Sequence, residues 1–237
     1  MEHGITWGEL FFAPLAHRLA EWGIDPVPAL DALIVSVLLI ALAYFGGRPF
    51  RRTELVEPDG KVSFSFLMEM LVGRMLAFFD GIIHHGARGL FFYLGSVSLF
   101  ILFNNLIGLI PGFNPPTDQF NVTFVLALMT FLIAHVIGVK AHGFVYIKKF
   151  MGPVWYMAPL IFPIEIISHL VRPLSLSMRL FGNMTGDHKV VAVFASLLAL
   201  GLPIPFLGLG VFVACLQAFV FVLLSAVYFQ DALDHPH

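Results

Sequence analysis

The sequence predicts an all-α integral membrane protein. Of its 237 residues, 59% are hydrophobic and only 12% are charged, against roughly 25% charged residues in an ordinary soluble domain. The mean hydropathy is +0.90, and several apolar stretches are each long enough to cross a bilayer. We interpret residues 1–237 as a single polytopic membrane domain. Its expected parts are about five transmembrane helices, one interfacial amphipathic helix and a C-terminal hairpin of two long tilted helices.

The first membrane span is expected at residues 27–46. Crossing the hydrocarbon core takes roughly 20 mostly apolar residues, and this is the first stretch that provides them. Residues 1–26 carry three glutamates around a short apolar patch, so they lack the pattern of a cleaved secretory signal. We expect them to form an outer N-terminal segment.

Residues 64–88 have the pattern of an amphipathic helix. Glu69, Arg74 and Asp80 interrupt Met, Leu and Phe at helical spacing. Each charge would cost about 2.5–3.5 kcal/mol at the bilayer centre. A helix lying at the membrane interface is therefore favoured over a sixth full span.

Residues 90–110 and 120–140 are expected to form two further spans, and residues 153–230 a long helical hairpin. The apolar stretch 153–201 would be about 70 Å long as one helix, so it must be steeply tilted, bent or divided. Three prolines are the expected bending points: Pro159, Pro163 and Pro173. The single cysteine, Cys215, lies in the last apolar run and is expected to be buried.

Basic residues predict the orientation in the membrane, because cytoplasmic loops carry an excess of Lys and Arg. Such residues follow the first and third spans: Arg48, Arg51, Arg52, Lys61, Lys140, Lys148 and Lys149. The loop 111–121 has none. With five spans, the N-terminus is expected outside and the C-terminus in the cytoplasm.

A stripe of polar side chains runs through the fourth apolar stretch. Glu165, Arg172 and Arg179 are spaced by seven residues, and Ser175, Arg179, Asn183 and Asp187 are spaced by four, so all fall on one broad helical face. Arg179 lies far from both ends and cannot easily reach water. Its cost in hydrocarbon is about 2.5 to more than 10 kcal/mol, which implies a counter-charge or a water-filled cavity. The alternative is an ion pair with Asp187 or Glu165 that only joins helices.

Other polar residues have two interpretations each. Arg172 is either an interfacial anchor or part of the stripe, and Gln217 either joins two helices or faces the stripe. His188, beside Asp187, suits a proton relay because histidine titrates near neutral pH. Four other histidines are expected to pack helices or lie at the interface, since no carboxylate or cysteine accompanies them at metal-ligand spacing: His84, His85, His135 and His142.

The stretch RPLSLSMRLFGNMTGDHKV, residues 172–190, closely resembles the signature of subunit a of the rotary F-type ATP synthases. Arg179 stands at the position of that family's essential arginine. Three further matches cover most of the chain after Leu90: NNLIGLIPG (104–112), PPTDQFNVT (115–123) and LQAFVFVLLSAVY (216–228). The resemblance implies a stator subunit of the membrane Fo motor in a bacterial inner membrane. Its implied partners are the c-subunit ring, the subunit b peripheral stalk, other ATP synthase subunits and lipid.

The resemblance also implies two offset half-channels that couple proton translocation to ring rotation and hence to ATP synthesis. Glu165, Ser168 and Ser175 would line the cytoplasmic half-channel, and Asn183, His188 and Gln217 the outer one. Some members carry glutamate at the position of His188 and histidine at the position of Gly210. Asp187 would then supply the missing carboxylate.

Competing functions are a secondary proton or ion transporter, a membrane metalloprotease and a membrane scaffold. A transporter predicts an inverted repeat, and a metalloprotease needs an HExxH helix or three converging ligands; the sequence shows neither. A scaffold would tolerate replacement of Arg179. The sequence has no GxxxxGK[ST] loop, so we expect no nucleotide site, cofactor or metal on this chain. A net charge of −2 argues against nucleic acid, and the choice between H⁺ and Na⁺ stays open.

Overall fold

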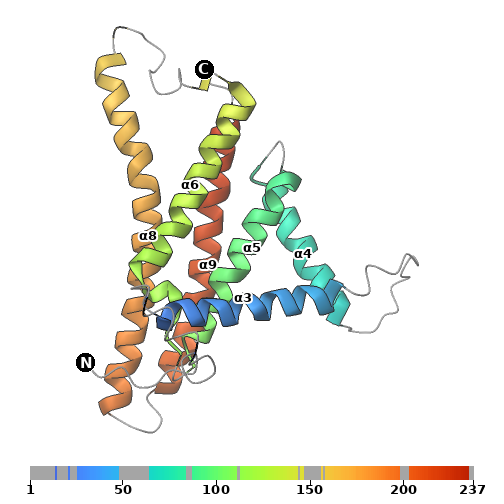
Figure 1. The fold of residues 1–237 in the computed structure, drawn as a ribbon, viewed down its shortest axis with the longest axis vertical. Helices are drawn as coiled ribbons and strands as arrows, with labels where there is room; N and C mark the ends of the chain where they lie inside the picture. The colour runs from blue at the N-terminus through green and yellow to red at the C-terminus, as the bar shows by residue number, and fades with distance from the viewer. Residues whose placement is uncertain are drawn as a thin grey trace.

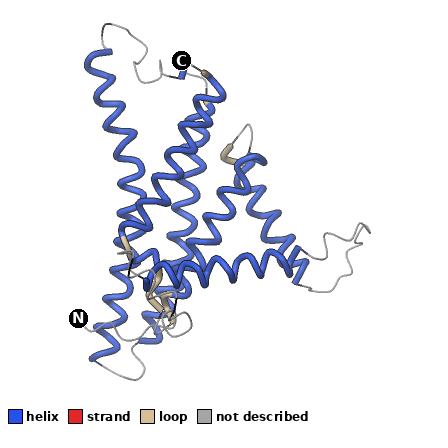
Figure 2. Tube along the Cα trace, in the orientation of Figure 1, coloured by secondary structure: helices blue, strands red, loops and turns tan. Residues whose placement is uncertain are grey.

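The computed structural model is helical throughout the part of the chain that it describes. The described residues are 14, 21, 26–47, 64–83, 87–110, 113–143, 145–146, 156, 158–197 and 203–234. Their elements are α3 (Pro26–Gly47), α4 (Phe64–Asp80), α5 (Ala87–Ile107), the short 3-10 helix η2 (Pro116–Asp118), α6 (Phe120–His142), α8 (Ala158–Leu197) and α9 (Pro203–Leu233) (Figures 1 and 2). Most of the expected outer segment 1–26 lies outside the described residues, as do His84, His85 and six of the basic residues that predicted the orientation: Arg48, Arg51, Arg52, Lys61, Lys148 and Lys149.

Five of the described helices are long and apolar enough to cross a membrane, which confirms the predicted class of fold. The candidate spans are Pro26–Phe45, Gly89–Ile107, Phe120–His142, Pro159–Val191 and Pro205–Leu233. The helix α4 is not among them; it carries Glu69, Arg74 and Asp80 over 17 residues. Its placement at the membrane interface stays a prediction.

Three helices run side by side along the long axis of the molecule. These are α6, α8 and α9, with α5 packed on α9 and α4 beside α5 (Figure 1). Their shared core includes Leu94 and Ile101 of α5, Leu180 of α8, and Phe221 and Phe229 of α9, all buried. The outer surface is also apolar: Phe92 is 78% exposed and Ile40 68%. A surface of this kind suits contact with lipid rather than with water.

The helix α8 is one uninterrupted helix of 40 residues that continues through Pro163 and Pro173. At 1.5 Å per residue it is about 60 Å long, about twice the thickness of the hydrocarbon core. Within residues 158–197 the stretch is therefore not divided. The shorter α3, with 22 residues, matches the membrane thickness and runs across the direction of α8 and α9 (Figure 1). If α3 stands upright in the bilayer, α8 and α9 are strongly inclined.

The expectation that Cys215 is buried is wrong, because it lies exposed on α9. In a soluble protein a small apolar side chain in an apolar run is usually internal. In a helix that faces lipid, apolar side chains cover both the inner and the outer face. Hydropathy alone therefore does not distinguish the two faces of such a helix.

Candidate functional site

The polar stripe lies along one face of α8. Ser168, Ser175, Arg179 and Asn183 are exposed, and Glu165 is half-buried. The buried side chains on the opposite side pack into the helical core: Leu176, Leu180 and Met184. Because α8 has no break, the seven- and four-residue spacings give a continuous row on both sides of Arg179.

Arg179 has no ion-pair or hydrogen-bond partner for its guanidinium among the described residues. The three ion pairs found there join His169 to Glu165, Arg172 to Asp231, and His188 to Asp118. The described structure therefore does not contain the pairing of Arg179 with Asp187 or Glu165 that the sequence left open. The guanidinium is available to a group outside this part of the chain.

The antiparallel pairing of α8 and α9 is set by polar contacts on either side of Arg179. Asn183 Nδ2 donates a hydrogen bond to Gln217 Oε1 over 2.6 Å, and Arg172 Nη1 donates to Asp231 Oδ2 over 2.7 Å. Gln217 thus meets the stripe one helical turn beyond Arg179. Its Nε2 is buried without a partner among the described residues, and a buried polar atom of this kind is ordinarily satisfied by water.

Gly210 of α9 leaves room for the carboxylate of Asp187. A Cβ added at this glycine would lie 2.6 Å from Asp187 Oδ2 and 2.7 Å from Leu109 Cδ2, closer than non-bonded atoms approach. The Asp187 carboxylate therefore occupies space that is open only because Gly210 has no side chain.

His188 finds its carboxylate partner in a different segment of the chain. Its Nδ1 lies 3.6 Å from Oδ2 of Asp118, a residue of η2, and the Thr185 hydroxyl donates a hydrogen bond to the other oxygen of that carboxylate. Sequence reasoning missed Asp118, although it lies in the quoted PPTDQFNVT match as the one carboxylate of that segment.

Two further polar residues that the sequence reading passed over lie near this end of the bundle. Asp31 of α3 is fully buried, and its Oδ2 accepts a hydrogen bond from the backbone N–H of Asn114 over 3.1 Å. Asn105 of α5 is also fully buried and accepts a hydrogen bond from the Thr117 hydroxyl over 2.8 Å. The available signal was a polar side chain within an apolar span: Asp31 stands alone in its span, and Asn105 follows Asn104.

The electrostatics around Asp118 favour its ionised form. Burial works to raise the pKa of Asp118, but the nearby imidazole of His188, the hydrogen bond from the Thr185 hydroxyl and the charge of Lys189 outweigh burial and hold that pKa below its ordinary value. Because the pKa is lowered in the folded protein, the stabilisation is present above the unfolded pKa. It is lost as the pH falls through the folded one.

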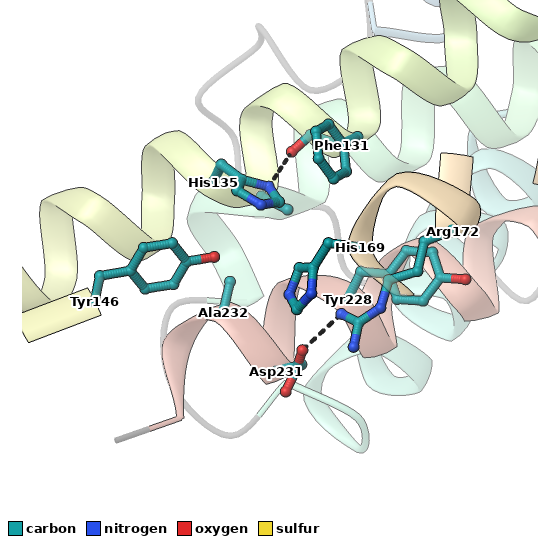
Figure 3. Close-up of a pocket in the computed structure, with 9 residues that line it drawn as sticks. Phe131, His135, Tyr146, His169, Arg172, Tyr228, Asp231 and Ala232 are labelled. Atoms are coloured by element: carbon teal, nitrogen blue, oxygen red, sulfur yellow. Dashed lines mark hydrogen bonds and ion pairs between the residues drawn. The ribbon is translucent and has the colours of Figure 1, made fainter. Parts of the chain in front are cut away.

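The opposite end of the hairpin holds a second polar cluster around a cavity of about 10 Å³. Its polar lining is His135, Tyr146, His169, Arg172, Tyr228 and Asp231 (Figure 3). The rings of His135 and His169 meet edge to face with centroids 5.6 Å apart, and His142 Nε2 lies 2.9 Å from the carbonyl oxygen of Leu233. Both His135 and His142 thus contact neighbouring helices. No group of three metal-ligating side chains occurs in the described ranges.

Comparison with known proteins gives one consistent family. A family model described as ATP synthase A chain matches residues 30–230. A protein named ATP synthase subunit a from Desulfosudis oleivorans is 42% identical over 231 residues, 96% of this chain and 98% of its own. Proteins of the same name from Trichlorobacter lovleyi and Geobacter sulfurreducens are 42% and 40% identical, covering 100% and 96% of both chains.

The register of α8 against α9 can be tested by cross-linking. We predict that Asn183→Cys combined with Gln217→Cys, in a Cys215→Ser background, forms an internal cross-link with a short thiol-specific reagent, because the two amide groups are in hydrogen-bond contact. The matched control is Met178→Cys with Gln217→Cys, since Met178 lies five residues before Asn183 and about 140° from it around α8. Mass spectrometry of the digested chain measures both yields, and equal yields would contradict the register.

Proposed function

The chain belongs to the ATP synthase A chain family, the stator subunits that conduct protons through the membrane motor, and we propose that Arg179 is the cation through which this chain couples proton transfer to rotation. The observation that carries the proposal is the position of Arg179. It lies on the exposed face of an unbroken helix, in the middle of a polar stripe, with no partner for its guanidinium among the described residues. A cation in hydrocarbon needs a counter-charge or water, so we infer that a group from another subunit approaches it.

We propose that this group is a carboxylate on each subunit of the rotating c-subunit ring, which packs against the exposed face of α8. The opposite face of α8 is buried against α6 and α9. Subunit b of the peripheral stalk and other subunits of the enzyme would hold this chain fixed. The apolar outer surface of the remaining helices supports contact with the lipid of a bacterial inner membrane.

The proposed coupling follows from the cost of charge in lipid. A carboxyl group that faces hydrocarbon is expensive to ionise, so the ring carries it in protonated form. At Arg179, attraction at about 4 Å and an effective dielectric constant near 20 is about 4 kcal/mol, which favours release of the proton. Arginine suits this position because its guanidinium stays charged when it is desolvated. The ionised carboxylate cannot return to lipid until another proton binds it.

Two aqueous half-channels would supply and remove the protons. On one side of Arg179, Glu165, Ser168 and Ser175 form the proposed cytoplasmic half-channel. On the other side, the proposed outer half-channel is lined by Asn183, Gln217, Asp187 and His188. We add Asp118 to this lining because it lies beside His188. The buried Nε2 atoms of Gln217 and His188, which have no partner among the described residues, support a hydrated path there.

We propose the orientation that the basic residues predict, with the N-terminus outside and the C-terminus in the cytoplasm. In that orientation the ends of α6 and α9 face the cytoplasm, and η2 with the start of α9 faces outward. The titratable pair of His188 and Asp118 in the outer path favours H⁺ as the transported ion. Each proton that crosses 100 mV then makes about 2.3 kcal/mol available for rotation.

The first prediction from this proposed function concerns Arg179 itself. Arg179→Ala removes an attraction of about 4 kcal/mol, so ATP-driven proton pumping in inverted membrane vesicles should fall by roughly a thousandfold, below detection. The amount of assembled enzyme should stay near that of the unmodified chain, because the guanidinium holds no contact among the described residues. Met178→Ala, an exposed neighbour, serves as the control and should pump normally. Pumping by the Arg179→Ala enzyme at an unmodified rate would refute the electrostatic role.

The second prediction concerns the outer path. Replacing both Asp187 and His188 by Ala should slow proton uptake from the outer side by about a hundredfold or more, since a positioned proton-transfer group usually contributes about 10²–10⁴-fold. The measurement is the rate of ATP synthesis driven by an imposed proton gradient. Val193→Ala, an exposed position further along α8, is the control, and an unchanged rate in the double variant would mean that the relay is wrongly assigned.

The third prediction uses the two glycines of α9. Gly210→Ala should push the carboxylate of Asp187 aside, since the new Cβ has no room, and proton pumping should fall by about tenfold or more, as misplacement by an ångström commonly costs. Gly208→Ala is the matched control because nothing lies within 4 Å of its added Cβ. Equal activity of the two variants would show that the position of Asp187 does not matter.

A further inference from the structure

Arg172 and Arg179 are the two arginines of α8, and they leave the helix in nearly the same direction. They are seven residues apart on an uninterrupted helix, which places them about 10 Å apart along its axis and within about 20° of each other around it. A second arginine on the face that we assign to the ring would attract the same carboxylates as Arg179. Lys189, the remaining cation of α8 in the described range, lies near its outer end and is exposed.

The structure holds Arg172 away from that face. Its Nη1 lies 2.7 Å from Asp231 Oδ2, and its guanidinium carbon lies 5.3 Å from the centre of the Tyr228 ring. Both partners belong to the last two turns of α9. Figure 3 shows the Arg172 and Asp231 side chains pointing toward one another across the α8–α9 contact. The carboxylate neutralises the charge, and the aromatic ring stacks beneath it.

Glu165 does not take the place of Asp231 as the partner of Arg172. It lies seven residues earlier on α8, and its Oε1 is 3.4 Å from His169 Nδ1. Of the two arginines, one is therefore paired with a residue of α9, and the other has no partner among the described residues. Because a guanidinium does not lose its proton at physiological pH, only a pairing of this kind can remove Arg172 as a competing cation.

We propose that Asp231 is a positioning residue that holds Arg172 against α9, so that a passing ring carboxylate meets a single free arginine. This inference rests on the proposed function of Arg179. Without Asp231, Arg172 becomes a second permanent cation about two helical turns toward the proposed cytoplasmic side. An ionised carboxylate released from Arg179 is then retained by Arg172 instead of being reprotonated, and rotation slows.

The test measures ATP-driven proton pumping by the complete enzyme in inverted membrane vesicles, normalised to the amount of this chain in the membrane. Asp231→Asn should lower pumping by about tenfold, because one unpaired guanidinium is added near the path. Asp231→Glu keeps the charge and should pump within about twofold of the unmodified enzyme. The decisive variant is Arg172→Gln with Asp231→Asn, which has no free second cation and should recover that rate.

If the Arg172–Asp231 pair only joined α8 to α9, pumping would not recover in the double variant. Pumping by the double variant as low as that of Asp231→Asn alone would show that the pair only joins α8 to α9 and would overturn the proposal. Normal pumping by Asp231→Asn would overturn it as well. If the Asp231→Asn chain is lost from the membrane, a charge-swapped chain, Arg172→Asp with Asp231→Arg, is measured in its place. The charge-swapped chain should pump normally, and failure to pump contradicts the proposal.

Arg179→Ala is measured beside these variants to separate the two claims. If it still pumps, the proposed function fails whatever the Asp231 variants do. If it is inactive while Asp231→Asn pumps normally, the proposed function stands and only the role of Asp231 is refuted.

Discussion

A permanent positive charge in the middle of a helix that is apolar enough to cross a membrane is the constraint on which the rest of the proposed mechanism depends. An arginine near a helix end extends its side chain to the interface, but Arg179 lies 21 residues from the start of α8 and 18 from its end. Such a residue needs a polar environment along its helix or a carboxylate supplied from outside. The hairpin of α8 and α9 suits this need because α8 is unbroken, with its polar stripe on one exposed face and the apolar core on the other.

In the proposed mechanism, the α8–α9 contact leaves this charge free for another subunit. On one side of Arg179, Asn183 is bonded to Gln217, and Asp187 fits against Gly210. On the other side, Arg172 is bonded to Asp231. Polar groups of α8 on both sides of Arg179 thus meet partners on α9, whereas the Arg179 guanidinium meets none among the described residues. An unpaired cation flanked by polar groups that lie against α9 is the arrangement expected where a moving partner binds and leaves.

The sequence predicted the helices well and the contacts between them poorly. The five spans follow from length and hydropathy, which are local properties, so the expected ranges 27–46, 90–110 and 120–140 lie within a few residues of α3, α5 and α6. Two ion pairs join residues that are 70 and 59 positions apart: Asp118–His188 and Arg172–Asp231. A periodic pattern within one helix does not predict contacts between residues so far apart in the sequence. The same limit applies to Cys215, because hydropathy does not tell a lipid-facing surface from a core.

The most direct test of the central claim is a structure of the complete membrane motor in lipid, with the group opposite Arg179 resolved. The account predicts a carboxylate of a ring subunit facing the guanidinium at about 4 Å, directly or through one water, with no acidic side chain of this chain between them. A guanidinium bound to a carboxylate of its own polypeptide, or turned away from the ring, would contradict it.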